Sequence, residues 1–262
     1  MSNDFLALIA QHKLELLTAK KAYYENLIKN MRSTGQRRYE VFKKAISKEG
    51  QINLIAEVKK ASPSAGLIRE DFNATKIANI YIKNQAAAIS VLTEEKYFLG
   101  KFAYLAAISE NCPLPILMKD FIVHEFQIYE GLFYGASAIL LIVAMLTDAQ
   151  LENLMKVAHG LGLDCLVEVH NQPELERAIK VGAEIIGVNN RNLKDLQVDL
   201  NTSLSLIPQI PKGTIIVAES GLKTHDDILR VKAAGAHAVL IGETFMRSPD
   251  IALKINEIMF AK

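Results

Sequence analysis

The sequence predicts a (β/α)8 TIM barrel with an extra N-terminal helical segment. Three observations predict this fold: short apolar runs alternate with longer amphipathic stretches, eight such runs follow residue 52, and a small-residue signal recurs about every 50 residues. Strands that alternate with helices form βαβ units and a parallel sheet. Eight such units close into a barrel in about 250 residues, and this chain has 262.

The eight apolar runs are the expected strands. In chain order they are Ile52–Val58, Ala87–Leu92, Leu114–Met118, Ala138–Val143, Asp164–Val169, Glu184–Val188, Thr214–Ala218 and Ala238–Ile241. The stretches between them have helix-like spacing, as a barrel of alternating strands and helices requires.

The recurring signal is a small residue where a helix ends and the next strand begins. It occurs at Gln85-Ala86-Ala87, Gly135-Ala136, Gly182-Ala183 and Gly235-Ala236, at spacings of 50, 47 and 53 residues. Glycine suits the position after a helix because it adopts positive φ at little cost. A period near 50 residues is two βα units, so four periods make eight. A doubly wound sheet, the alternative fold, requires no four-fold pattern.

Residues 1–48 are expected to form an N-terminal helical extension, and residues 49–262 a single barrel domain. Apolar residues recur near a 3.6-residue period through Met31, and Ser33-Thr34-Gly35 is expected to break the helix. The extension carries a net charge of +6, which leaves −5 for the rest of the chain. This charge fits a solvated helix face or a basic rim that attracts an anionic substrate. A nucleic-acid surface is disfavoured because aromatic and basic residues do not interleave.

Composition restricts the class of protein further. The 30 basic and 29 acidic residues nearly balance, so no global field draws the chain to nucleic acid or membrane. The longest apolar run, Ala138–Leu146, is too short to span a bilayer, and the N-terminus lacks the basic region of a secretory signal. Two cysteines, Cys112 and Cys165, suit a reducing compartment. We expect a cytoplasmic enzyme, monomeric, with neither a membrane nor a nucleic-acid partner.

Ionisable side chains end several of the expected strands, and barrel active sites lie at the carboxyl ends of strands. Glu57 and Lys59 end the first run, Lys119 the third and Glu168 the fifth. Alternate side chains of a strand share a face, so Glu57 and Lys59 point the same way as Ile55. Neighbouring carboxylates and ammoniums shift each other's pKa, as general acid–base catalysis needs. A structural layer of ion pairs is the alternative, and four such residues at one mouth argue against it.

Glycine-bearing turns follow the seventh and eighth runs, at Ser220-Gly221 and Gly242-Glu243. In such barrels these two loops commonly hold a phosphate group with backbone N–H groups. Arg191 adds a forked positive charge, and Ser62 lies in a hydroxyl-bearing loop after the first run. A small phosphorylated substrate is therefore expected. The sequence has no Walker pattern, dinucleotide fingerprint or zincin spacing of histidines, so no nucleotide cofactor and no metal is expected.

Eight stretches, taken together, resemble the indole-3-glycerol phosphate synthase family. They follow in consistent order over about residues 50–260: IAEVKKASPSAG, SVLTEEKYFLG, ILMKDFIV, AILLIVAML, CLVEVHN, IIGVNNRNL, IVAESGL and VLIGETFM. The resemblance implies a carboxy-lyase of tryptophan biosynthesis. Such an enzyme closes the pyrrole ring of 1-(2-carboxyphenylamino)-1-deoxyribulose 5-phosphate, with loss of CO₂ and water and without a cofactor.

The resemblance also implies roles for individual residues. Catalytic positions match Glu57, Lys59, Lys119, Glu168, Asn189 and Ser220. Phe98 and Phe121 match the residues that line the anthranilate pocket, and Leu140 matches an apolar wall. Phosphate contacts match Ser62, Arg191, Gly221, Gly242 and the backbone of Glu243. Two positions depart from some members of the family. Ala61 replaces a lysine, and Glu243 replaces a serine, so that only the N–H of Glu243 is expected to reach phosphate.

The chemistry agrees with these roles. Lys119 can protonate the ketone oxygen as the ring carbon attacks it. Lys59 and Glu168 are candidates for the acid and the base of dehydration, in either order, and Glu57 can orient Lys59. The nearest rival is phosphoribosylanthranilate isomerase, which typically uses a Cys and an Asp, and the first expected strand ends without a cysteine. A catalytically silent sugar-phosphate regulator is the rival from another class, and it would be expected to have lost Lys119 or Glu168.

Overall fold

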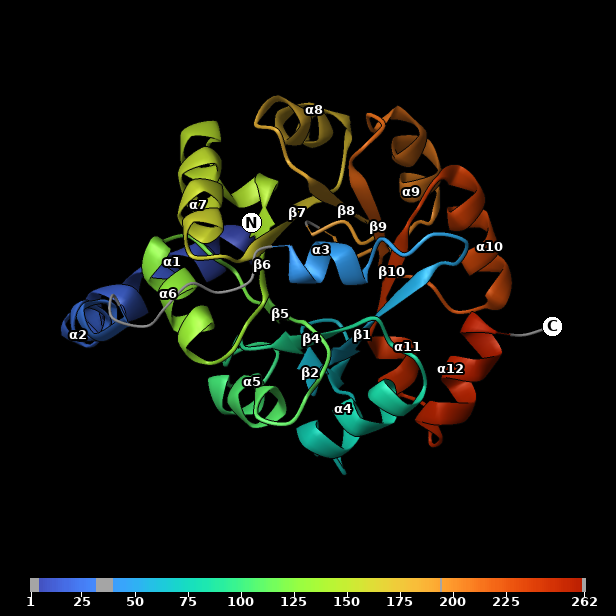
Figure 1. The fold of residues 1–262 in the computed structure, drawn as a ribbon, viewed down its shortest axis with the longest axis horizontal. Helices are drawn as coiled ribbons and strands as arrows, with labels where there is room; N and C mark the ends of the chain where they lie inside the picture. Colours follow the sequence, from blue (N-terminus) through green and yellow to red (C-terminus); the bar gives the residue numbers. More distant parts are fainter. Residues whose placement is uncertain (1–4, 32–39, 194, 261–262) are drawn as a thin grey trace.

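In the computed structural model, which describes residues 5–31, 40–193 and 195–260, eight parallel strands close into a barrel surrounded by helices (Figure 1). The strands follow one another around the ring in sequence order, and the last pairs with the first. The predicted (β/α)8 barrel is therefore confirmed over the doubly wound alternative. The strands are β1 (Asn53–Val58), β4 (Ala88–Leu92), β5 (Ile116–Lys119), β6 (Ala138–Ile142), β7 (Asp164–Val169), β8 (Ile185–Asn189), β9 (Ile215–Glu219) and β10 (Ala238–Ile241).

Each barrel strand leads into a helix that packs on the outside of the ring. Several of these helices begin at a polar cap: the side chains of Asn73, Thr147, Asn171 and Thr224 each accept a hydrogen bond from the backbone N–H three residues on. The helices are α4 (Ala74–Lys83), α5 (Phe102–Ser109), α6 (Glu125–Phe133), α7 (Asp148–Gly160), α8 (Gln172–Lys180), α9 (Asn201–Leu206), α10 (His225–Ala234), α11 (Glu243–Met246) and α12 (Ile251–Met259), with 3-10 turns η1 (Val143–Met145) and η2 (Ile207–Gln209).

The four-fold repeat marks the junctions where a helix ends and a strand begins. Backbone φ is positive at all four repeat positions, Gln85, Gly135, Gly182 and Gly235. The prediction of a left-handed residue at these junctions is confirmed, and at Gln85 a residue other than glycine adopts that conformation. The chain thereby reverses direction and enters the next strand within two or three residues.

Two apolar cores lie on opposite faces of the strands, because side chains alternate along each strand. The larger core lies between the strands and the outer helices. The smaller one fills the barrel interior, with Ile55, Leu117, Leu166 and Val217 among its members. Continuing the same alternation, Glu57 follows Ile55 by two residues and so reaches the carboxyl end of the interior.

The N-terminal extension contacts both ends of the barrel. Helix α1 (Phe5–Ala19) reaches the carboxyl end, where Lys13 pairs with Asp120, and α2 (Lys21–Met31) packs on α6 through stacked Tyr24 and Phe126 rings. Lys13 is buried rather than part of a solvated face. The helix break expected at residues 33–35 lies outside the described residues.

Helix α3 (Val41–Ala45) lies across the middle of the ring in Figure 1 and closes the amino end of the barrel. Backbone N–H groups of Phe42 and Lys43 donate to Oδ2 of Asp164, the first residue of β7, at 2.9 and 3.0 Å. Phe42 and Ile46 are fully buried members of the interior core. The boundary expected at residue 48 stays a prediction, and residues on both sides of it share one core. Within the described ranges, none of the helices is both long and apolar enough to cross a membrane.

Candidate active site

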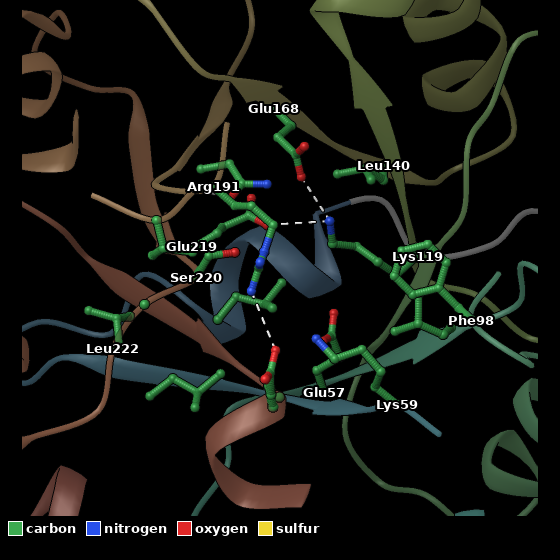
Figure 2. A pocket seen from close by; sticks show the side chains of 18 of the residues that line it. Glu57, Lys59, Phe98, Lys119, Leu140, Glu168, Arg191, Glu219, Ser220 and Leu222 are labelled. Carbon is green, nitrogen blue, oxygen red and sulfur yellow. Dashed lines mark hydrogen bonds and ion pairs between the residues drawn. The ribbon is translucent and has the colours of Figure 1, made fainter. Parts of the chain in front are cut away.

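A cavity of about 480 Å³ opens at the carboxyl end of the barrel. Thirteen of the fourteen predicted site residues line it, and Figure 2 shows many of them pointing toward its centre from different strands. They are Glu57, Lys59, Phe98, Lys119, Phe121, Leu140, Glu168, Asn189, Arg191, Ser220, Gly221, Gly242 and Glu243. Residues separated by up to 186 positions in sequence therefore meet in one space, because parallel strands all end at the same face.

Ser62, the fourteenth predicted residue, lies apart from this lining. It belongs to a small hairpin of β2 (Ala61–Ser62) and β3 (Gly66–Leu67), in the loop that follows β1. Its hydroxyl accepts a hydrogen bond from the backbone N–H of Ala65 at 3.2 Å. Ser64, at the tip of the hairpin, instead accepts a hydrogen bond from Arg191 at 3.3 Å. The loop after β1 therefore contacts Arg191 through Ser64 and not through Ser62.

Lys59 forms a close ion pair with Glu57 at the end of β1. Nζ of Lys59 lies 2.7 Å from Oε2 of Glu57, and the two side chains are 15% and 5% exposed. Gly242, after β10, leaves the space for this carboxylate: a Cβ at residue 242 would lie 2.2 Å from Oε2 of Glu57. Any side chain at residue 242 would thus displace a proposed acid–base group. Gly242 was predicted from the phosphate loop alone, and this contact is a second reason for glycine there.

Lys119, at the end of β5, lies between two buried carboxylates (Figure 2). Its Nζ is 2.8 Å from Oε2 of Glu168 and 3.4 Å from Oε2 of Glu219. Burial alone would lower the pKa of Lys119, but the neighbouring carboxylates of Glu168, Glu219 and Glu57 outweigh burial and raise it. Lys119 is therefore an ammonium at neutral pH.

The two carboxyl groups beside Lys119 respond to their surroundings in opposite ways. Burial raises the pKa of Glu168, but the ammonium of Lys119 and the imidazole of His170, which lies 3.1 Å away, together hold that pKa well below its usual range. For Glu219, burial and the negative charges of Glu168 and Glu57 dominate over Lys119 and raise the pKa to about 8. The cluster thus contains the three carboxyl groups of Glu57, Glu168 and Glu219. It also contains the two ammoniums of Lys59 and Lys119, so a proton on Glu219 brings the net charge of these five groups to zero.

Glu219 is the main site residue absent from the predicted set. It ends β9 and lines the cavity, and its side chain is 2% exposed. A Cβ on Gly187, in the neighbouring strand β8, would lie 2.0 Å from Oε1 of Glu219, so that glycine provides its space. The sequence held a signal for Glu219: it ends a predicted strand just as Glu57 and Glu168 do.

One wall of the cavity is aromatic and apolar. The rings of Phe98 and Phe121 pack with their centroids 5.9 Å apart, and Leu140 points into the cavity nearby. Glu94 holds the loop before Phe98 in place, because its carboxylate accepts hydrogen bonds from the backbone N–H groups of Lys96, Tyr97 and Phe98. This wall suits a flat aromatic group.

The opposite side of the cavity carries backbone turns and positive charge. Ser220 and Gly221 have positive φ values of 66° and 76°, and Asn190 holds the turn by donating to the carbonyl of Ser220 at 3.0 Å. Arg191 is fixed from its own backbone, where its N–H donates to Oδ1 of Asn189 at 3.0 Å. Its guanidinium also donates to the carbonyl of Leu196 at 3.1 Å. Successive N–H groups in such a turn form a concavity for an anion.

The side chain of Glu243 takes part in this region, which the sequence analysis did not anticipate. One carboxylate oxygen lies 3.4 Å from Arg191 and the other 2.9 Å from Arg247. Arg247 also lines the cavity. Glu243 thus contributes a charge-paired side chain as well as a backbone N–H. Over the described part of the chain, no three His, Cys, Asp or Glu side chains gather in a way that could hold a metal ion.

The fold and this site define a class: a (β/α)8-barrel enzyme with a buried cluster of lysines and glutamates between an aromatic wall and a glycine-bearing turn beside Arg191. Comparisons with known proteins specify the family. The indole-3-glycerol phosphate synthase family model matches residues 6–258. Curated relatives named indole-3-glycerol phosphate synthase include one from Acetivibrio thermocellus, 47% identical over 95% of this chain and 96% of its own length. Another, from Endomicrobium trichonymphae, is 50% identical over 92% and 90%. The chain belongs to the indole-3-glycerol phosphate synthase family, as the sequence motifs predicted.

Solved structures with much lower sequence identity share the fold. They include 3-hexulose-6-phosphate synthase from Salmonella typhimurium, with a TM-score of 0.64 at 13% identity over 79% of this chain and 97% of that one. A tryptophan synthase alpha-subunit from Pyrococcus furiosus has a TM-score of 0.60 at 13% identity, covering 79% and 98%. These likenesses support the barrel architecture alone.

Proposed function

We propose that this protein converts 1-(2-carboxyphenylamino)-1-deoxyribulose 5-phosphate to indole-3-glycerol phosphate, with release of CO₂ and water. The observation that carries the proposal is the position of Lys119: an ammonium held by two buried carboxylates, between an aromatic wall and an anion-binding turn. A substrate with an anthranilate ring at one end and a phosphate at the other matches these two sides. Family membership supports the same reaction.

Substrate binding uses the two sides of the cavity. The anthranilate ring lies against Phe98 and Phe121, with Leu140 as its apolar neighbour. The phosphate lies at the turn of Ser220 and Gly221, where Arg191 can add a charge-assisted hydrogen bond. Gly242 and the backbone N–H of Glu243 contribute from the next loop. The hairpin that contains Ser62 contributes from the loop after β1, where Ser64 contacts Arg191. Asn189 fixes Arg191.

The acid–base cluster carries the chemistry. Lys119 donates a proton to the ketone oxygen as the ring carbon attacks, and loss of CO₂ then restores aromaticity. Dehydration needs a second acid and a base, for which Lys59 and Glu168 are the candidates, with Glu57 orienting Lys59. These groups come from the chain itself, and we assign no cofactor. We also propose that the protein is a cytoplasmic monomer.

The test is direct turnover. The purified protein is incubated separately with this substrate and with phosphoribosylanthranilate, the substrate of the rival isomerase. Indole fluorescence and product mass are recorded. Formation of the indole product from the first substrate alone is expected. Isomerisation of the second would favour the rival reaction, and binding without turnover would favour a silent sugar-phosphate regulator.

A further inference from the structure

One histidine beside the acid–base cluster has no role in the proposed reaction. His170 follows β7 directly and its side chain is 9% exposed. Its two ring nitrogens contact two different carboxylates: Nε2 lies 3.1 Å from Oε1 of Glu168, and Nδ1 lies 2.9 Å from Oε2 of Glu174. His170 thus connects Glu168, inside the barrel, to the outer helix α8.

Glu168 is held from two sides. Oε2 of Glu168 lies 2.8 Å from the ammonium of Lys119, whereas Oε1 lies beside His170. With Glu168 only 1% exposed, rotation of its carboxylate would break one of these two contacts. The imidazole therefore fixes the orientation of the carboxylate that Lys119 contacts.

His170 is itself fixed by the start of α8. Oε2 of Glu174 accepts a hydrogen bond from the backbone N–H of His170 at 2.8 Å, in addition to its contact with the ring. Oε1 of Glu174 accepts from the side chain of Asn171 at 2.7 Å, while Asn171 caps the helix through the N–H of Glu174. The rotamer of the imidazole is thus set by the contact of Nδ1 with Glu174, whose carboxylate the other three hydrogen bonds hold in place, and Nε2 faces Glu168.

We propose that His170 is a positioning residue for the reaction, which holds Glu168 toward Lys119 as the central member of a chain Glu174–His170–Glu168–Lys119. The proposal rests on the proposed function, because it assigns Glu168 and Lys119 to the chemistry. His170 and Glu174 lie outside the cavity lining, so they act through Glu168 and not on the substrate. Charges alternate along the chain, and each group stabilises the charged form of the next.

Groups from every neighbouring element enter the electrostatics of this chain. Glu219 from β9 and Glu168 oppose each other's charge, Lys119 from β5 stabilises both, and Glu57 from β1 acts on Lys119 and Glu219. Burial lowers the pKa of His170, but the neighbouring carboxylates of Glu168 and Glu174 raise the pKa to about 9. The imidazolium form is therefore the one present at neutral pH.

Three variants separate positioning from mere structure. His170→Asn keeps an amide near the place of Nδ1 and loses the contact with Glu168. His170→Gln offers a neutral donor to Glu168, and Glu174→Gln leaves the imidazole but removes its outer carboxylate. His225→Gln is the matched control, since Nδ1 of His225 contacts the carbonyl of Ile258 at 2.8 Å at the start of α10. We measure kcat, KM and the pH profile of kcat for each.

The expected result for His170→Asn is a fall in kcat of about 10-fold to 100-fold with KM nearly unchanged, because a small misplacement of a catalytic group costs this much. The acid limb of kcat should move to higher pH, since Glu168 has lost one of its two cations. His170→Gln should lie between wild type and His170→Asn. Glu174→Gln should match wild type near about pH 6 and approach His170→Asn near about pH 8, where its imidazole has lost its proton while that of wild type, with a pKa of about 9, is still mostly charged. His225→Gln should leave kcat unchanged.

Two results would overturn the proposal. One is a His170→Asn variant that loses thermal stability but retains the kcat and acid limb of wild type. The other, decisive also if His170→Asn does not fold, is a Glu174→Gln profile that follows wild type at every pH. Failure of the proposed function is distinct, since wild type itself would then show no turnover.

Discussion

The ammonium of Lys13, in the N-terminal helix α1, lies 2.5 Å from Oδ1 of Asp120, the residue directly after Lys119. Both side chains are nearly buried, at 10% and 2% exposed. Asp120 also accepts hydrogen bonds from Thr93 at 2.6 Å and from the backbone N–H of Phe121 at 2.7 Å. The extension is thus tied to the segment that carries Lys119 and the aromatic wall.

We expect Lys13→Met to lower stability and raise KM, because it leaves the carboxylate of Asp120 buried without its cation. Losing one partner of a buried ion pair costs roughly 3–5 kcal/mol. Urea unfolding measures the loss, and steady-state kinetics measures KM. The control is Lys21→Met: its pair with Glu25 spans 3.8 Å with both side chains at least 60% exposed, so it should cost less than about 1 kcal/mol. Equal effects of the two variants would remove Lys13 from this role.

Truncations should distinguish the two parts of the extension. A chain that begins at residue 40 keeps α3 and should fold, with weaker substrate binding because Lys13 is gone. A chain that begins at residue 48 also loses Phe42 and Ile46 from the barrel core and leaves Asp164 without its two backbone donors. Removing one large buried aromatic side chain alone costs about 3–5 kcal/mol. Solubility and the thermal transition report the difference. If the chain that begins at residue 48 is stable and unfolds cooperatively, α3 is dispensable for folding.

The pKa of Glu219 predicts how stability depends on pH. Its folded-state pKa, about 8, lies above the unfolded value near 4.5. The folded protein therefore binds this proton more tightly, and the corresponding stability is complete below pH 4.5 and is lost as pH rises through 8. Glu219→Gln keeps the shape and removes the titration. Its melting temperature should match wild type at about pH 5 and exceed it increasingly toward about pH 9. A constant difference across this range would contradict the assignment.

The strands could be predicted from the sequence because each is a short apolar run bounded by a helix. The site residues at strand ends could be predicted for a related reason: in a parallel barrel, topology alone brings Glu57, Lys119 and Glu168 to one face. The phosphate loops could also be predicted in this way, because glycine-bearing turns follow the seventh and eighth strands. The aromatic residues depended on the family resemblance, since nothing in the pattern around Phe98 and Phe121 marks them as lining a cavity.

Other features depended on side-chain packing that no sequence pattern encodes. Lys13 looked like a solvated lysine, because the pattern of α1 does not reveal that Asp120 lies beneath it. Ser62 and Ser64 are equally plausible anion ligands in sequence, and only the turn of the hairpin decides which reaches Arg191. Glu243 was assigned a backbone role because it replaces a serine of some family members, and its pairing with Arg191 joins two loops that are far apart in sequence.

Gly187 should matter for activity more than for stability. A Cβ at this position meets the carboxylate of Glu219 at 2.0 Å, whereas its next contacts are at 3.2 Å. In Gly187→Ala the carboxyl group of Glu219 must therefore leave its position beside Lys119. We expect kcat to fall by about 10-fold or more, with a modest change in melting temperature. Gly160→Ala is the control, because a Cβ there meets nothing within 4 Å at the end of α7. Unchanged kcat in Gly187→Ala would mean that the position of Glu219 is unimportant.

Lys119 is the residue on which the proposed chemistry depends most. Lys119→Met keeps an apolar stem of similar length and removes the proton. General acids contribute about 10²–10⁴-fold, so kcat should fall by at least about 10²-fold, which corresponds to about 2.7 kcal/mol in the activation free energy. Stability should change little near about pH 6, because Glu168 retains His170 as a cationic partner and Glu219, whose pKa is about 8, is already protonated at that pH.

Lys119→Arg decides between catalysis and a purely structural ion pair. A guanidinium restores the positive charge between Glu168 and Glu219, but it does not give up a proton at any relevant pH. If Lys119 is the general acid, Lys119→Arg should be as inactive as Lys119→Met. If Lys119 only balances two carboxylates, Lys119→Met should lose stability with turnover largely retained, and Lys119→Arg should restore the stability. Measuring kcat by indole fluorescence and the melting temperature for both variants separates these outcomes, and near-normal turnover in Lys119→Met would remove this residue from the mechanism.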